Sequence, residues 1–282
     1  MCRKLALVAT ALTLAGAPAL AAPMGGAAPM ASQPASVQQA AARPAPPQPP
    51  PEPPRKASPQ ERAEAERLDD LGRYAFWSRE FSVDPRDTEA GIKLSKSLRG
   101  LGRFDEAGAA ADQVLVLEPA NLEALLESAR ARIGANQGFY AIPFAQRAQA
   151  VAPRDWRPVT LLAVAFEQAE RNDEALAAHQ KALALAPDNP AVLTNLGMFY
   201  AAHGQPAQAE PLLRRAASLP GATAQERQNL ALVLGLEGRF DEAERLARQD
   251  LPPAQVDNNL NYLRASATPS TPRSWQGVGA AQ

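Results

Sequence analysis

The chain is poor in the side chains that build most catalytic and metal sites. It has one cysteine, Cys2, and two histidines in 282 residues. This excludes an intramolecular disulfide framework and a cysteine-based zinc site, and it argues against a centre built from several histidines. Its 29 lysines and arginines nearly balance its 30 aspartates and glutamates, so charge argues against nucleic-acid binding. Aromatic residues make up only 5%, and what remains is an alanine-led composition compatible with helices.

The motifs of common enzyme classes are absent as well. His179 and His203 do not have the spacing of zinc ligands, and we expect both to pack or to lie at the surface. No Gly-x-Ser-x-Gly elbow occurs, and the only Gly-Gly pair precedes no strand that could hold a phosphate. We therefore expect a protein that is not an enzyme, with no catalytic residue, no metal, no cofactor and no small-molecule substrate.

The first residues have the pattern of a secretory signal peptide. Arg3 and Lys4 precede an apolar run over residues 5–15, and small residues follow up to Ala19-Leu20-Ala21. The run is too short to span about 30 Å of hydrocarbon as a helix. We expect cleavage after Ala21 and export to the periplasm as a soluble protein. Cys2 precedes the apolar run, so it is not placed for lipid attachment, and only a peripheral association with the outer membrane stays open.

Two segments have the composition of chain that does not fold. Residues 22–59 contain twelve prolines and almost no bulky apolar side chain, so they cannot form a core. The residues after 264 are rich in serine, threonine, proline and glycine. The sequence thus predicts four parts: a signal peptide (1–21), a disordered linker rich in proline and alanine (22–57), a folded domain (58–264) and a flexible tail (265–282).

The folded domain is built from a repeat of 34 residues. Prolines recur at this interval at Pro85, Pro119, Pro153 and Pro187, and five alanines share the period: Ala107, Ala141, Ala175, Ala209 and Ala243. If Thr88 is place 1, later units begin at Leu122, Trp156, Pro190 and Ala224. A degenerate unit in front would be closed by Pro85, with an apolar face formed by Leu68, Leu71, Tyr74 and Trp77.

Each unit has the pattern of two helices. In the fourth, Leu193, Leu196 and Tyr200 form one apolar stripe, and Gly204 ends the helix. Place 15 holds Gly102, Gly204 and Gly238, with Asn136 in the second unit, as a left-handed residue at a helix end requires. The small residue at place 20 lets the two helices approach closely. Asp-Glu pairs at 105/106, 173/174 and 241/242 fall at the starts of second helices, where carboxylates are favourable.

These units resemble tetratricopeptide repeats, which have small residues at places 8 and 20, an aromatic residue at 11 and proline at 32. The best matches are Asn195-Leu196-Gly197 with Tyr200, and the two Gly-Arg-Phe-Asp-Glu-Ala runs that begin at Gly102 and Gly238. The resemblance implies an all-α, right-handed superhelical solenoid of five to six antiparallel helix pairs. A last helix around residues 257–264 would cover its end with Leu260 and Leu263. The second unit departs most, with Ser128, Arg132 and Gly138 at places that expect larger apolar residues.

A narrower resemblance covers about 35 residues, from Asn229 through Leu251-Pro252-Pro253 to Arg264. This run is similar to the carboxy-terminal part of TadD-type proteins, which are exported tetratricopeptide-repeat proteins of the tight-adherence (Flp) pilus assembly machinery. It implies a scaffold whose partners are proteins of a pilus or secretion machinery. The alternative is a periplasmic chaperone that captures the C-terminal segments of its clients, as tetratricopeptide modules of cytochrome c maturation do.

In such a solenoid, the first helices line a groove, and we expect places 2, 5, 9 and 12 to project into it, with the candidate residues taken from places 5 and 9. Place 9 changes from basic to apolar along the chain, which suits a peptide or an amphipathic helix with an acidic end. The alternative is that the basic residues are simply solvated and the apolar ones pack between neighbours. The candidate partner-binding residues are Ile92, Lys96, Leu126, Arg130, Thr160, Val164, Thr194, Met198, Gln228 and Leu232.

Overall fold

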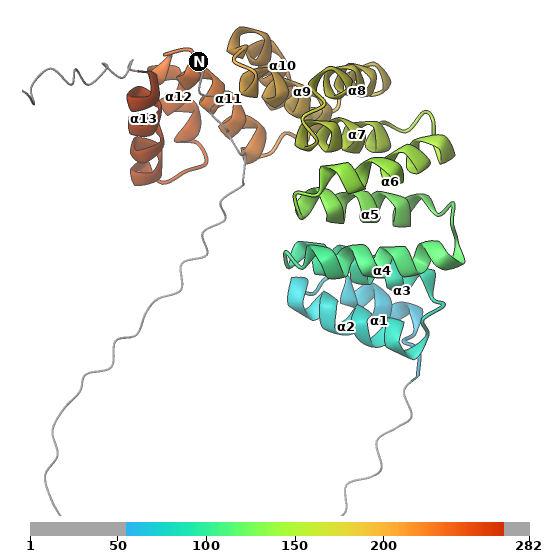
Figure 1. Cartoon of the computed structure of the whole chain (residues 1–282). Coiled ribbons are helices and arrows are strands. Elements are labelled where there is room, and N and C mark those ends of the chain that lie inside the picture. The colour runs from blue at the N-terminus through green and yellow to red at the C-terminus, as the bar shows by residue number, and fades with distance from the viewer. Residues whose placement is uncertain (1–54, 268–282) are drawn as a thin grey trace, which may run out of the picture. The chain divides into compact units, whose positions relative to one another are not determined.

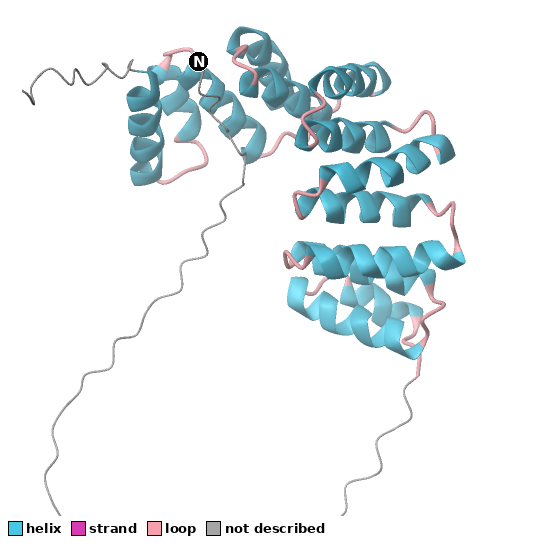
Figure 2. Cartoon of the chain, viewed as in Figure 1, coloured by secondary structure: helices cyan, strands magenta, loops and turns pink. Residues whose placement is uncertain are grey.

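A computed structural model describes residues 55–267, and within these residues the chain forms thirteen helices and no strand (Figures 1 and 2). The predicted leader, most of the predicted linker and residues 268–282 of the predicted tail lie outside the described residues. The helices are α1 (Pro59–Ala65), α2 (Asp70–Val83), α3 (Thr88–Gly100), α4 (Phe104–Leu117), α5 (Leu122–Gly134), α6 (Gly138–Val151), α7 (Trp156–Gln168), α8 (Asn172–Leu185), α9 (Pro190–Ala202), α10 (Pro206–Ser218), α11 (Ala224–Leu236), α12 (Phe240–Ala247) and α13 (Pro253–Ala267).

The five predicted repeat units are the helix pairs α3/α4, α5/α6, α7/α8, α9/α10 and α11/α12. Every first helix begins at place 1 of its unit, as the 34-residue period predicts. From α2 to α13, each helix packs against the next one along the chain, and α3, α5 and α7 also pack side by side. The fold is therefore the predicted all-α solenoid.

The first helices begin where they do because each has a capping side chain one residue earlier. The oxygen of this side chain accepts a hydrogen bond from a backbone N–H in the first turn, and each such cap contributes about 1 kcal/mol. None of α4, α6, α8, α10 or α12 has a side-chain cap. The caps recur every 34 residues: Asp87, Asn121, Asp155, Asn189 and Thr223.

The turn inside each unit requires one residue in the left-handed region. Gly102, Gly204 and Gly238 have φ values of 73°, 72° and 80°, and Asn136 has 57°, all at place 15 as predicted. The third unit is the exception, because a glutamate, Glu170, has φ 57° there. A side chain with a Cβ atom is strained in this conformation, so this turn stores backbone strain.

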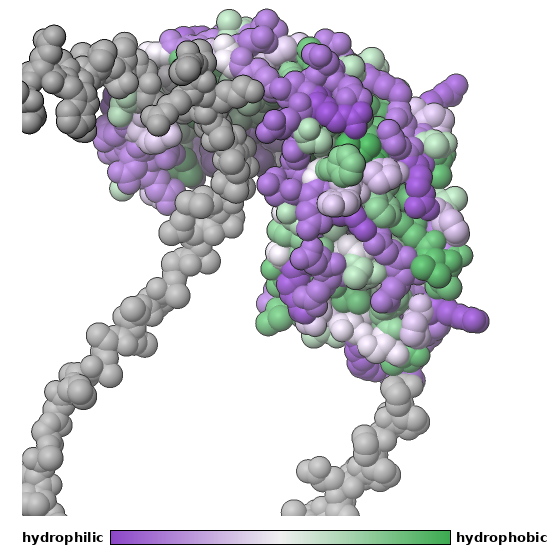
Figure 3. Space-filling view, viewed as in Figure 1, coloured by the Kyte–Doolittle hydropathy of each residue, from purple (hydrophilic) through white to green (hydrophobic). Residues whose placement is uncertain are grey.

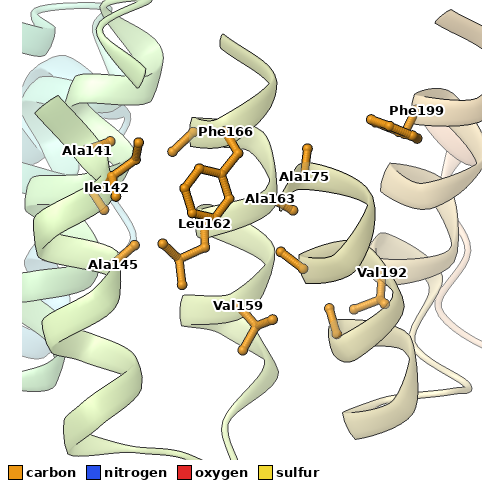
Figure 4. Packing of buried hydrophobic residues seen from close by; sticks show 14 residues of the cluster. Ala141, Ile142, Ala145, Val159, Leu162, Ala163, Phe166, Ala175, Val192 and Phe199 are labelled. Atoms are coloured by element: carbon orange, nitrogen blue, oxygen red, sulfur yellow. The ribbon is translucent and has the colours of Figure 1, made fainter. Parts of the chain in front are cut away.

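Small side chains at places 8 and 20 bring the two helices of a unit together. The five alanines at place 20 are all buried. At place 8 of the fourth unit, a Cβ atom on Gly197 would lie 2.8 Å from Leu213 of the second helix. The larger side chains fill the space between units: Figure 4 shows Ile142 of α6 beside Leu162 and Phe166 of α7.

The unusual residues of the second unit have specific partners. Ser128 donates a hydrogen bond to Asp112 of α4 at 2.8 Å, and Arg132 binds the same carboxylate at 2.6 Å. The guanidinium of Arg132 also lies 4.0 Å from the centre of the Phe144 ring. At Gly138, a Cβ atom would lie 2.6 Å from the backbone oxygen of Ala165. Glycine is therefore required here, because α6 approaches the backbone of α7.

The ends of the stack differ from the prediction in detail. At the front, Trp77 is buried, but Leu68 and Leu71 are exposed and contribute no apolar face. The short α1 has few residues to place over them. At the other end, Leu260 and Leu263 are buried as predicted, in a capping helix α13 that begins at Pro253, four residues earlier than expected.

Packing is uneven along the stack. Contacts between α8 and α9 are sparser than at the corresponding joints of the other units, and α7 hardly touches α9, although α3, α5 and α7 touch one another in sequence. We call this place the α8–α9 joint. Among the residues that cross it is Phe199 of α9, whose ring lies 5.4 Å from the ring of His179 on α8.

Candidate binding surface

The residues at place 9 of the first helices form a row, one from each unit, which we call the place-nine row. All five side chains are half-buried, so each presents part of its surface to solvent. The row reads Lys96, Arg130, Val164, Met198 and Leu232. Met198 also packs against the apolar core of α9–α13. The row therefore combines packing with partial exposure.

The prediction that place 5 projects into a groove is wrong for three of its five residues. Leu126 is 0% exposed and belongs to a core cluster with Leu125 and Val114. Thr160 and Thr194 are 8% and 5% exposed, and neither hydroxyl has a hydrogen-bond partner within the described part of the chain. Only Ile92 and Gln228 are half-buried. Place 5 faces the neighbouring helices, because packing in the stack continues beyond each helix pair.

The basic end of the place-nine row is paired within the chain. The ammonium of Lys96 lies 3.5 Å from the carboxylate of Glu123 on α5, which also binds Arg157 of α7 at 2.7 Å. Arg130 binds Glu127 at 2.6 Å, and the same carboxylate accepts a hydrogen bond from Nε of Arg99 at 2.9 Å. The row is therefore less cationic than its sequence indicates.

Glu123 and Asp155 stay ionised at neutral pH. Burial raises the pKa of Glu123, but the hydrogen bond from Arg157 and the charge of Lys96 outweigh it, so the pKa lies below its ordinary value. The pKa of Asp155, opposed by burial in the same way, is lowered by its hydrogen bonds with Arg157. These carboxylates therefore neutralise their basic neighbours under physiological conditions.

Each histidine has a hydrogen-bonding partner within the fold. His179 is buried, and its Nε2 lies 2.6 Å from a carboxylate oxygen of Glu167. His203 bonds through Nδ1 to the backbone oxygen of Phe199 at 2.8 Å. Among residues 55–267, no group of three or more histidine, cysteine, aspartate or glutamate side chains is arranged to hold a metal ion. No helix of the same part is long and apolar enough to cross a membrane.

Sequence reasoning placed places 2 and 12 at the groove, but it missed place 6 and the ion pairs that these residues make with the row. Glu123 and Arg157 occupy place 2 of their units, Glu127 occupies place 6, and Arg99 occupies place 12. Alignment of these places between neighbouring units would have indicated the opposite charges. Beyond the third unit, place 6 holds Asn195 and Asn229, so polar but uncharged side chains accompany Met198 and Leu232. On the face shown in Figure 3, apolar and polar patches alternate along the stack.

Comparisons with known proteins agree with this architecture. A family model described as tetratricopeptide repeat matches residues 166–221. No curated protein sequence matches the chain. Among solved structures, a thermophilic tetratricopeptide-repeat protein of Thermus thermophilus is 26% identical with a TM-score of 0.55, and the match covers 64% of this chain and 97% of that one.

Two further solved structures show the fold alone, because their sequence identity is low. A tetratricopeptide-repeat protein of Parabacteroides merdae is 13% identical with a TM-score of 0.60, covering 74% of this chain and 86% of that one. PilF of Pseudomonas aeruginosa is 20% identical with a TM-score of 0.51, covering 65% and 90%. In fold, the described part of this chain is thus a tetratricopeptide-repeat solenoid.

Proposed function

We propose that this protein is a non-enzymatic scaffold that binds segments of other proteins on the surface of its first helices. One observation carries the proposal: Val164, Met198 and Leu232 occupy the same place in three successive units, and each keeps part of an apolar side chain at the surface. A segment laid across the units would meet one apolar contact per repeat. The tetratricopeptide-repeat fold supports this role, because such solenoids serve in protein–protein interaction.

The finer proposal is that the partners belong to a Flp/Tad-type pilus or secretion machinery and that the protein acts in the periplasm. Its support is the resemblance of residues 229–264 to TadD-type proteins and the leader-like pattern of residues 1–21. The rival role is that of a periplasmic chaperone. A scaffold should hold a small set of folded machinery proteins, whereas a chaperone should capture many unfolded clients.

Photocrosslinking in cells tests the proposal. A photoreactive amino acid at Met198 should attach a small set of proteins, because this side chain lies in the apolar part of the place-nine row. The matched control is the same amino acid at Gln180, which is exposed on α8. Machinery proteins attached only from position 198 would support the scaffold, and a broad mixture of unfolded proteins would support the chaperone. Identical adducts from both positions, or none from 198, would contradict binding on this surface.

A further inference from the structure

Two aromatic side chains lie at the surface where the second helix of the second unit begins. Phe139 and Tyr140 of α6 are 67% and 63% exposed, and we call them the ring pair. Their ring centres lie 5.6 Å apart with the ring planes at 85°, an edge-to-face contact that keeps the two rings in a defined arrangement. Only 5% of the chain is aromatic, so the exposure of two rings side by side requires a reason.

The other units show that the fold does not require rings here. The ring pair occupies places 18 and 19, which hold Asp-Glu in the first, third and fifth units and Ala207-Gln208 in the fourth. In those three units, the glutamate at place 19 pairs with an arginine at place 16. The second unit has Gln137 at place 16, so it lacks both members of this ion pair. Exposed apolar side chains at a place that is solvated elsewhere indicate a contact surface.

An exposed carboxylate lies close to the ring pair along the surface. Gln137, two residues before Phe139, donates a hydrogen bond from its Nε2 to Asp105 of α4 at 3.4 Å. Asp105 is exposed, and within residues 55–267 it takes part in no ion pair. The surface thus combines aromatic faces with a negative charge, which suits a ligand that has apolar rings and a basic end.

The chain itself contains a segment with this chemistry. Residues 43–54, outside the described residues, read Arg-Pro-Ala-Pro-Pro-Gln-Pro-Pro-Pro-Glu-Pro-Pro. A segment of this composition favours polyproline II, which has three residues per turn and rises about 3.1 Å per residue. In that conformation, four prolines about 9 Å apart share one side, and Arg43 precedes them: Pro44, Pro47, Pro50 and Pro53.

We propose that the ring pair binds the proline-rich run, residues 43–54, of a second copy of this chain. Proline rings on one side of a polyproline II segment pack on aromatic side chains, and Arg43 lies at the end of the run that can approach Asp105. The ring pair is on a second helix, whereas the place-nine row is on the first helices. Self-association through the ring pair is therefore independent of the proposed function.

The place where the run joins the folded domain favours a second copy over the same one. Lys56 is held by Asp84 and Asp87 at the connection between α2 and α3. The ring pair lies at the other end of the helices, because α6 begins at the turn inside its unit (Figure 1). The thirteen residues of α3 span about 20 Å, whereas residues 49–54, where proline is densest, span about 19 Å. This part of the run falls short of the rings of its own copy.

The proposed contact joins two different surfaces, because each copy has one run and one ring pair. Such heterologous contacts continue from copy to copy and give open chains or rings larger than a dimer. The average mass of the full chain in solution should therefore rise with concentration beyond that of a dimer.

Sedimentation equilibrium of the full chain tests this with a matched pair of double variants. Phe139→Asp with Tyr140→Glu should be monomeric, and it should fold because three other units carry Asp-Glu at these places. Ala207→Asp with Gln208→Glu adds the same charges at the same places of the fourth unit and should associate like the unchanged chain. A monomeric unchanged chain at every concentration, or equal association of the two double variants, would overturn the inference.

Peptide binding tests the ligand. A fluorescent peptide of residues 43–54 should bind the full chain saturably, as measured by anisotropy. Phe139→Ala with Tyr140→Ala, which removes the rings without adding charge, should weaken binding at least about tenfold, as loss of central aromatic contacts does in other interfaces. The same peptide with alanine at 44, 47, 50 and 53 is the control and should bind as weakly as the parent peptide binds the variant.

Two results of the peptide titration would contradict the proposal. Equal binding of the two peptides, or equal binding to the unchanged chain and the alanine variant, would show that the rings do not recognise the run. Peptide binding at the rings by a chain that stays monomeric at every concentration would assign the rings to another ligand and overturn association through a second copy.

Discussion

Glu170 carries the backbone strain of the third unit. It is the one residue at place 15 that is neither glycine nor asparagine, and its φ of 57° is costly for a side chain with a Cβ atom. Glu170→Gly should raise the free energy of unfolding by about 0.5 to 1 kcal/mol, because relief of strain exceeds the added entropy of the unfolded chain. Urea denaturation measures this. Gly204→Ala is the reciprocal control and should lower stability by about 1 kcal/mol. Equal free energies of unfolding for the unchanged chain, Glu170→Gly and Gly204→Ala would contradict backbone strain at Glu170.

Ala175 of α8 lies buried in the core shared with α7. It is buried at place 20, where every unit has alanine. Ala175→Leu should reduce the free energy of unfolding by about 1 to 3 kcal/mol, because the larger side chain forces the paired helices apart. Thermal and urea unfolding test this against Ala177→Leu, which changes a more accessible residue of the same helix and should be nearly neutral. Similar midpoints for the two variants would mean that the pair tolerates the extra volume.

At the scale of the element, α1 is held to the rest of the stack mainly by ion pairs. Its only buried apolar residue is Ala65, whereas Arg62 pairs with Glu80 at 3.0 Å and with Asp87 at 2.6 Å. The preceding Lys56 pairs with Asp84 at 2.5 Å. The rest of the stack is held by apolar clusters, so α1 should respond to pH and salt when other helices do not.

The direction of the pH effect follows from the carboxylates. A hydrogen bond from Arg55 lowers the pKa of Glu61 to about 2, and Lys56 lowers the pKa of Asp84. Burial opposes the shift at Asp87, but Arg62 still lowers its pKa. Groups with lowered pKa stabilise the folded form above their ordinary pKa and lose this effect as pH falls through the lowered values. Because Asp84 and Asp87 bind Lys56 and Arg62, release of α1 is expected as the pH falls below 3.8, the ordinary pKa of these carboxylates, and through their lowered pKa values.

Trp77 reports this release, because its ring lies 5.7 Å from the guanidinium of Arg62. In the double variant Trp156→Phe and Trp275→Phe, Trp77 is the remaining tryptophan. Its fluorescence should change on acidification before helix content falls. Arg62→Gln should shift this change to higher pH. A spectrum that changes only together with global unfolding would show that α1 is held by something other than these ion pairs.

At the scale of the whole molecule, stability should divide at the α8–α9 joint. Solenoid units stabilise mainly their neighbours, and contacts across this joint are sparse. Leu213→Ala, which removes a buried side chain of α10, should cost about 2 to 5 kcal/mol and speed amide hydrogen exchange chiefly in α9–α12. Leu125→Ala in α5 is the matched variant, and it should speed amide hydrogen exchange chiefly in α3–α8. Uniform acceleration along the chain in both would contradict a division at this place.

The fold could be predicted from the sequence because its signals repeat. Proline at place 32, alanine at place 20 and glycine at place 15 each recur, so one period predicts every helix start from Thr88 to Ala224. The caps from Asp87 to Thr223 share this period and would have strengthened the prediction.

The binding surface was harder to predict, because it depends on contacts between units. Whether Leu126 or Arg130 reaches solvent is decided by the rotation of one first helix against the next, which a pattern within one unit does not contain. Apart from Arg130 with Glu127, which are three positions apart, the ion pairs around the row join residues of different units, as in Lys96 with Glu123 and Arg157 with Glu123. Only an alignment of unit against unit would show them.

The sparse α8–α9 joint has a mechanical consequence. A stack with equal contacts between its units bends evenly along its length, whereas a stack with one sparse contact bends mainly at that contact. Val164 lies on α7 and Met198 on α9, so the two side chains lie on opposite sides of the joint. We therefore expect the distance between these two apolar side chains to vary more than distances within either part of the stack, with Val192 and Phe199 of α9 shifting against the core of α7 and α8.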